Sequence, residues 1–235
     1  MSLFTYKLPK DTIFIEIMEK SYSHINNKGE NLDLILDSIF KSKINGFYIE
    51  LGANDGLRQS NTAFFEFYRN WTGLLIEPSL DAFLQCRAVR PKSICLNLAC
   101  VSNTYTNDFI DGDFNGHMMS SVNGVRTNNT NLTRVNVATL EKILDTFNAG
   151  SIDFLSLDTE GYEYEVLCGL NLNKYRPKYM LIEIYNTQYH SLVKFLEDNN
   201  YRLICNLSNY NKIDNPGWDG THNDYLFIDS TIHLE

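Results

Sequence analysis

Residues 46–56, with the sequence GFYIELGANDG, constrain the fold of this 235-residue chain more than any other stretch. A short apolar run leads into a turn with two glycines, Gly52 and Gly56. Glycine lets such a turn bring backbone N–H groups against a ligand at the start of the next helix. A second apolar run at 73–76 ends in Glu77, about 20 residues past the turn, where a carboxylate can accept both hydroxyl groups of a ribose. The pattern predicts a strand–turn–helix–strand unit that binds a nucleoside.

The turn also indicates the kind of nucleoside. It reads Glu-x-Gly-x-x-x-Gly from Glu50 to Gly56, so it lacks the middle glycine of Gly-x-Gly-x-x-Gly, which makes room for a pyrophosphate. A nucleoside without phosphates fits better, and S-adenosylmethionine is the common ligand of that description. A short dinucleotide-binding oxidoreductase and a nucleoside-binding module without catalysis are the two alternatives. The missing glycine speaks against the first, and the carboxylates described below speak against the second.

The rest of the sequence predicts a fold of the α/β class. Further strands are predicted near 73–77, 93–101, 152–157, 178–184, 200–206 and 223–229, and helices near 60–69, 79–87, 139–147, 162–168 and 188–198. This alternation favours a mostly parallel, doubly wound, Rossmann-like sheet with helices on both faces. In such sheets ligands bind beyond the carboxyl ends of the strands. We therefore expect the following carboxylates along one rim: Glu50, Glu77, Asp158 and Glu183.

Two segments lie outside this alternation. Residues 1–43 are predicted to form a helical lead-in to a single domain at 44–235, because apolar residues recur at helical spacing between 11 and 41. Residues 102–136 are rich in Asn, Ser, Thr, Asp and Gly, and they are longer than a compact fold needs for a connection. We expect this second segment to be a loop that covers the acceptor site and is mobile without ligand.

Two carboxylates near the rim have several possible roles. Asp158 ends an apolar strand ahead of Glu160 and Gly161, so it could simply cap the next helix. On the rim it could instead bind the methionine end of the ligand, orient a hydroxyl group or hold a metal. Glu183 interrupts an apolar strand, where a buried carboxylate needs a partner or a function. Asp158 and Glu183 could share Mg²⁺ or Mn²⁺ through oxygen ligands, or a cationic sulfonium could balance their charge.

Histidines are sparse in the chain. His117, in the polar segment 102–136, could be a general base near neutral pH or a surface residue without a role in catalysis. His222, just before the last strand, has the same two interpretations. The sequence has no Gly-x-Ser-x-Gly elbow and no Walker loop, so acyl hydrolysis and phosphoryl transfer lack their usual groups.

The amino-acid composition limits the kinds of binding partner that this chain can have. A net charge of −9 argues against nucleic acid, since binding to phosphate backbones depends on clustered Lys and Arg. Residues 1–20 carry charges where a signal peptide needs an apolar centre, and no apolar run is long enough to cross a membrane. We expect a soluble, cytoplasmic protein without a membrane partner. The 5 cysteines form no Cys-x-x-Cys pair, and we expect them to be reduced thiols inside the protein.

Taken together, the motifs resemble the FkbM family of S-adenosylmethionine-dependent methyltransferases. The matching pieces, in family order, are YIELGANDG at 48–56, LIEP at 75–78, NLACVS at 97–102, TLEKIL at 139–144 and IDFLSLDTEG at 152–161. The resemblance implies a class I methyltransferase fold and O-methylation of a sugar or another hydroxylated metabolite, with a small molecule or a glycan as the acceptor. It also implies cofactor contacts at Glu50, Gly52, Ala53, Asn54, Asp55, Gly56, Glu77, Pro78 and Ala99.

Methyl transfer to a hydroxyl group is an in-line displacement on a carbon that the sulfonium already activates. The enzyme therefore positions the reactants and handles one proton. Asp158 is the first candidate for orienting or deprotonating the hydroxyl group, and the alternatives are Glu160, Glu183 and His117.

Overall fold

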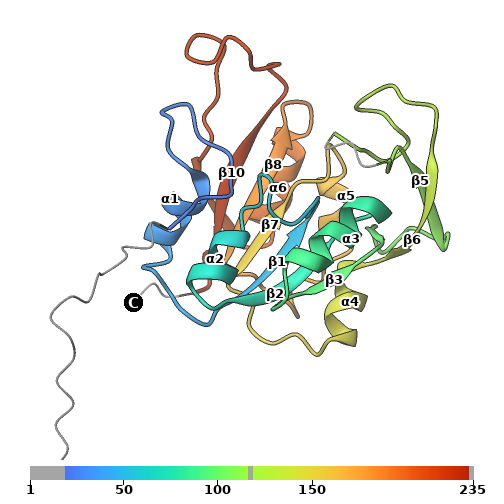
Figure 1. The fold of residues 1–235 in the computed structure, drawn as a ribbon, viewed down its shortest axis with the longest axis horizontal. Coiled ribbons are helices and arrows are strands. Elements are labelled where there is room, and N and C mark those ends of the chain that lie inside the picture. The colour runs from blue at the N-terminus through green and yellow to red at the C-terminus, as the bar shows by residue number, and fades with distance from the viewer. Residues whose placement is uncertain (1–18, 116–118, 233–235) are drawn as a thin grey trace, which may run out of the picture.

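The computed structural model describes residues 19–115 and 119–232. His117 and the first part of the predicted helical lead-in therefore lie outside the described residues. The main feature is a 7-stranded sheet (Figure 1). In spatial order its strands are β3 (Ile94–Leu96), β2 (Thr72–Ile76), β1 (Phe47–Leu51), β7 (Phe154–Leu157), β8 (Tyr179–Tyr185), β10 (His222–Asp229) and β9 (Tyr201–Asn206).

The strand order fixes where a ligand can bind. Strands β3, β2, β1, β7 and β8 are parallel, and β10 runs antiparallel to both β8 and β9. The chain builds outward from β1 in one direction and from β7 in the other, so the carboxyl ends of β1 and β7 flank the switch point. Ligands of open α/β sheets bind at such a point. The predicted Rossmann-like class I methyltransferase architecture is confirmed.

Helices cover both faces of this sheet. One face packs against α1 (Leu32–Ile39), α2 (Ala63–Tyr68) and α3 (Leu80–Val89), and the other against α4 (Leu140–Thr146), α5 (Glu163–Cys168) and α6 (Tyr189–Asp198). Because successive strand residues point to opposite faces, Tyr48 of β1 joins the first core and Ile49 joins the second. This is why the central strands are almost wholly apolar. No helix in the described ranges has the length and apolar character needed to cross a membrane.

Part of the predicted lead-in belongs to the core. Leu32 and Leu36 of α1 are fully buried against the sheet face that carries α2 and α3. Ahead of α1, the chain runs beside the β9–β10 connection, where the Asn27 N–H donates to the carbonyl of Ser208 at 2.9 Å. In Figure 1 these are the blue segment and the red-orange segment that rise side by side.

A small sheet corrects two predictions. It contains β4 (Ala99–Cys100), β6 (Thr133–Ala138) and β5 (Phe109–Gly112), in that order. The strand predicted at 93–101 breaks into β3 and β4, because the Asn97 amide group donates to the carbonyls of Glu77 and Pro78 at 3.0 and 2.8 Å and turns the chain. The segment 102–136 is not a plain loop. It contains β5 and most of β6, whose apolar residues pack in a satellite core with Phe114.

Candidate active site

A cavity opens at the carboxyl ends of the parallel strands, between the main sheet and the small sheet. Nine of the predicted site residues line it: Gly52, Ala53, Asn54, Glu77, Pro78, Ala99, Asp158, Glu160 and Glu183. Three others, Glu50, Asp55 and Gly56, are not part of the lining. The structure therefore brings together the β1 turn, the end of β2 and the ends of β7 and β8.

The glycines of the β1 turn are required by the protein itself. Gly52 has φ +79°, and a Cβ atom there would lie 1.8 Å from the carbonyl oxygen of Asp158. Gly56 has φ +82°, and its Cβ would lie 2.9 Å from Sγ of Cys86 on α3. Any larger residue would push the turn away from β7 or α3. Gly52 thus sets the end of β1 directly against Asp158.

Glu77 has the geometry expected of a ribose-binding carboxylate. One oxygen accepts the N–H of Asn54 at 2.9 Å, and the other accepts the N–H of Ser79 at 2.8 Å. A carboxylate has about four lone-pair sites, so one acceptor position on each oxygen remains. Burial raises the pKa of Glu77 to about 7, although the two backbone hydrogen bonds oppose this shift. A ligand that donates two hydroxyl groups would compensate for that burial.

Glu50 does not reach the rim. β1 continues to Leu51, so the Glu50 side chain points to the same face as Tyr48, beneath α2 and α3. Its oxygens accept the Asn61 N–H at 2.9 Å and the hydroxyl groups of Ser60 and Thr62 at 2.9 and 2.6 Å. In this structure Glu50 holds the chain that follows the turn.

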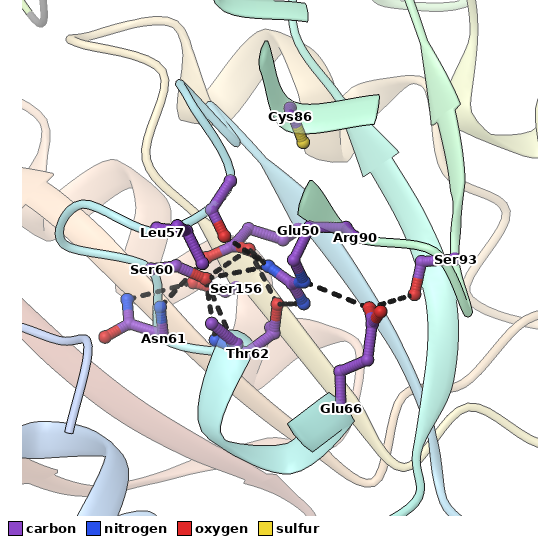
Figure 2. A network of polar contacts seen from close by, with 12 residues as sticks. Glu50, Leu57, Ser60, Asn61, Thr62, Glu66, Cys86, Arg90, Ser93 and Ser156 are labelled. Carbon is purple, nitrogen blue, oxygen red and sulfur yellow. Dashed lines mark hydrogen bonds and ion pairs between the residues drawn. The ribbon is translucent and has the colours of Figure 1, made fainter. Parts of the chain in front are cut away.

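Arg90 completes the buried network around Glu50. Its guanidinium lies 3.7 Å from Glu50 and 3.0 Å from Glu66, and it donates to the carbonyl of Gly56 at 2.8 Å (Figure 2). Arg90 and Glu66 are fully buried. Asp55 acts nearby in the same way, since its side chain accepts the N–H groups of Leu57 and Arg58 at 2.9 and 2.7 Å. These charged side chains shape the turn from inside.

Asp158, Glu160 and Glu183 form a carboxylate cluster, with one oxygen of each within 4.8 Å of the others. Burial, with the charge of Glu160, raises the pKa of Asp158 well above its usual range. Burial and the charge of Asp158 do the same to Glu183, which is only 8% exposed. Among the described residues, no amide, hydroxyl or charged donor reaches Oδ1 of Asp158 or Oε2 of Glu183. Two buried carboxyl groups this close need a shared proton or a cation.

The capping interpretation of Asp158 is wrong. Helix α5 begins at Glu163, and its N-cap position is Tyr162. Glu163 itself holds the intervening loop, because Oε1 accepts the N–H groups of Thr159 and Gly161 at 2.8 and 3.0 Å. The Asp158 side chain is therefore free to face the cavity.

His222 extends the cluster toward the surface. Its Nε2 lies 3.2 Å from Oε1 of Glu183, and its Nδ1 lies 2.8 Å from the Thr221 hydroxyl group. The first distance would suit an ion pair, but burial lowers the pKa of His222 and raises that of Glu183. Both shifts fit a neutral Glu183 carboxyl group that donates its proton in a hydrogen bond to Nε2 of a neutral His222 imidazole. Because Thr221 donates to Asp219 at 2.6 Å, it accepts from Nδ1–H of His222.

The segment after β5 forms a cover over the cluster. Phe114, Ser121 and Val122 of this segment line the cavity. Arg126 ties the cover down, since it lies 3.4 Å from Glu160 and 2.5 Å from Asp219. The segment 102–136 therefore borders the cavity, while its role as a cover of the acceptor site and its mobility stay predictions.

The sequence did not predict several residues that line the cavity, and three of them come from segments outside the predicted motifs or from their edges. His24 comes from the segment ahead of α1, Arg58 from the β1 turn, and Phe114 from the end of the small sheet. The alternating pattern Val135–Val137 of β6 could have revealed the small sheet. Nothing in the local sequence around His24 indicates a site, because its position depends on a contact with α1.

The topology and the cavity define a class I methyltransferase. The model of the methyltransferase FkbM domain matches residues 50–203. The chain belongs to the FkbM family and is an S-adenosylmethionine-dependent methyltransferase. The predicted family is confirmed.

Solved structures with a similar chain path include other methyltransferases. Precorrin-6y C5,15-methyltransferase from Geobacter metallireducens has a TM-score of 0.47 at 10% identity, over 83% of this chain and 87% of that one. Fibrillarin from Aeropyrum pernix, with natively bound S-adenosyl-L-methionine, has 0.47 at 12%, over 90% and 83%. TrmK from M. capricolum, with S-adenosyl-homocysteine, has 0.45 at 11%, over 86% and 71%. At these values the likeness bears on neither substrate nor mechanism. Among curated proteins, none matches this chain.

Proposed function

We propose that this methyltransferase methylates a hydroxyl group of a sugar or another small hydroxylated metabolite. One observation carries the proposal: the carboxylate cluster Asp158, Glu160 and Glu183 lies in the same cavity as Glu77. Glu77 suits a ribose, and the cluster offers hydrogen-bond acceptors to the hydroxyl groups of an acceptor molecule. A cavity built this way would hold a nucleoside and a hydroxylated acceptor next to each other.

The residues present fit S-adenosylmethionine, which supplies the activated methyl group when bound. Glu77 would accept the ribose hydroxyl groups, and the turn at Gly52, Ala53 and Asn54 would approach the amino-acid end. The buried Ser79 hydroxyl group has no partner among the described residues. It lines the cavity beside Glu77 and offers a further hydrogen bond to the adenosine.

The cluster would manage the proton of the acceptor. Asp158, set against the β1 turn by Gly52, would orient the hydroxyl group and accept its proton, with Glu160 and Glu183 as alternatives. Burial raises the pKa of Asp158 and Glu183, and a carboxylate with a raised pKa is a stronger base than an ordinary one. Glu183 can pass a proton to His222 over the 3.2 Å contact. His117, outside the described residues, stays a predicted alternative base.

Mg²⁺ or Mn²⁺ is a second way to stabilise the same carboxyl groups. Asp158 and Glu183, joined by Glu160, provide the oxygen ligands that these ions prefer. In that form Asp158 and Glu183 would hold the ion and position the hydroxyl group. Activity that survives EDTA treatment and does not rise with added Mg²⁺ or Mn²⁺ would assign the cluster to proton transfer alone.

The direct test is methyl transfer from isotopically labelled S-adenosylmethionine to a panel of methyl glycosides, with mass spectrometry of the products. We expect a product that gains one methyl group and keeps it through alkaline hydrolysis, as an ether does and an ester does not. Methylation of a nitrogen or a carboxylate, or of RNA but no glycoside, would contradict the proposal.

A further inference from the structure

His24 lies in the cavity although it comes from a segment ahead of the family domain. The family model begins at residue 50, and His24 precedes α1. It lines the same cavity as Asp158, Glu183 and His222. Nothing in the proposed methyl transfer has used this residue.

The structure holds His24 in place through Asp33. Asp33, in the first turn of α1, is fully buried. Its carboxylate accepts the hydroxyl group of Ser21 at 2.6 Å and the N–H groups of Tyr22 and Ser23 at 2.7 and 3.2 Å. The Ser23 hydroxyl group in turn accepts the N–H of Asp33 at 2.9 Å. A buried carboxylate with this many donors fixes the backbone immediately before His24.

A second set of contacts fixes the other side. The Leu32 N–H donates to the carbonyl of His24 at 2.9 Å, and the Tyr210 hydroxyl group donates to the carbonyl of Ile25. The segment is therefore tied both to α1 and to the β9–β10 connection. This double attachment fixes the backbone on both sides of His24 and so sets its place at the cavity.

The backbone contacts of this segment place His24 on the β8–β10 side of the cavity, which Glu183 and His222 also line. Burial lowers the pKa of His24, and the charge of Asp224 opposes this effect. The Asn27 N–H donates to the Ser208 carbonyl, and the Ser208 hydroxyl group accepts the N–H of Asp224, which is paired with Glu183 across β10 and β8. A neutral imidazole has one donor nitrogen and one acceptor nitrogen. Next to carboxyl groups, it complements a ring with several hydroxyl groups.

Resting on the proposed function, we propose that His24 binds a hydroxyl group of the sugar acceptor next to the one that is methylated. The segment before the family domain is then part of the acceptor site and selects among sugars. His24 is a contact for the acceptor and not for S-adenosylmethionine.

The test compares His24→Ala and His24→Gln with His190→Ala, an exposed histidine on α6. The substrates are methyl α-D-glucopyranoside and its manno, galacto and rhamno counterparts. We expect His24→Ala to raise the acceptor KM roughly tenfold, as the loss of one hydrogen bond would do. We expect the Kd for S-adenosylhomocysteine to stay within about twofold, and His24→Gln, which keeps a donor and an acceptor, to recover part of the KM. An unchanged acceptor KM, or an equal loss of S-adenosylhomocysteine affinity, would overturn the assignment.

A binding measurement keeps the test decisive when turnover is slow. The chain has 5 histidines, so the imidazole C–H resonances can be assigned by substitution and followed by NMR as each glycoside is added to the complex with S-adenosylhomocysteine. We expect the His24 and His222 resonances to move together while that of His190 stays in place. If the His222 resonance moves and the His24 resonance does not, the role of His24 is overturned and the proposed function stands. No movement of either and no transfer overturns the proposed function, and the role of His24 with it.

Discussion

If Glu77 binds the ribose as proposed, the binding of the cofactor should depend on pH. Its pKa of about 7, raised by burial, lies above the ordinary 4.5, so its contribution to stability is present below about pH 4.5 and is lost as pH rises through 7. Ribose hydroxyl groups donate to the ionised form. We therefore expect the affinity for S-adenosylhomocysteine to rise about tenfold from pH 6 to pH 8, following the ionised fraction of a group with this pKa.

Calorimetric titration of wild type and Glu77→Gln measures this effect. The amide cannot ionise, so the variant should bind S-adenosylhomocysteine more weakly at pH 8, by about 1.5 to 3 kcal/mol. Its affinity should also lack the rise between pH 6 and pH 8 that we expect of the wild type. The same pH profile in both proteins would show that another group controls binding.

Asp158 should matter for transfer and not for folding. Its folded pKa is raised, so its contribution to stability is present below the ordinary 3.8 and is lost as pH rises through the folded value. Asp158→Asn removes that penalty, and its Tm at pH 8 should equal or exceed that of wild type. Methyl transfer should slow by at least about 10²-fold. A folded variant that turns over nearly as fast as wild type would remove Asp158 from the mechanism.

Of the four rim carboxylates predicted from the sequence, Glu77, Asp158 and Glu183 line the cavity and Glu50 does not. Glu77 and Asp158 directly follow β2 and β7, and both line the cavity. Glu50 is one residue short of the end of β1, and the alternation of side chains turns it inward. The predicted end of β1 was wrong by one residue, and for that reason the buried structural residue Glu50 was predicted to contact the cofactor.

Between elements, Arg90 joins α3 to β1 and the turn. It contacts Glu50, Glu66 and the carbonyl of Gly56 from a fully buried position. Arg90→Met leaves two buried carboxylates without their cation and should lower the free energy of unfolding by about 3 to 5 kcal/mol. Arg87→Met, at an exposed position on the same helix, should change it by less than about 0.5 kcal/mol. Urea denaturation measures both, and equal effects of the two substitutions would refute this role.

The cover over the cluster depends on Arg126. Its guanidinium contacts Glu160 and Asp219 and lies 5.4 Å from the centre of the Tyr185 ring. These contacts are partly exposed, so Arg126→Ala should cost up to about 1 kcal/mol. Amide hydrogens at 119–129 should then exchange about fivefold faster. Arg134→Ala, which removes an exposed pair within the small sheet, is the control. Exchange that is unchanged by Arg126→Ala would show that other contacts hold the cover.

The small sheet shows why some elements could not be predicted. Its strands are short, and few of their residues are apolar: Ala99, Ile110, Val135 and Val137 pack in the satellite core. Short strands depend on contacts with distant parts of the chain more than on local preference. The apolar strands of the main sheet carry a stronger signal, because they are buried on both faces.

For the whole molecule, charge argues for a small acceptor. The net charge is −9, and the cavity carries the carboxylate cluster. We expect no measurable binding of a fluorescent 20-nucleotide RNA by anisotropy at about 50 mM salt, where phosphate contacts are still strong. Binding that weakens steeply with added salt would contradict this expectation and point to a nucleic-acid acceptor.

In the proposed mechanism, Glu77 binds the nucleoside while the carboxylate cluster Asp158, Glu160 and Glu183 handles the acceptor hydroxyl group. The most direct measurement is a single experiment on wild type, Glu77→Gln and Asp158→Asn, which records S-adenosylhomocysteine affinity and the rate of methyl ether formation on a glycoside. We predict that Glu77→Gln loses affinity, while Asp158→Asn keeps affinity within about threefold and loses at least about 10²-fold in rate. Equal losses of affinity in both variants, or ether formation that is independent of both carboxylates, would contradict the account.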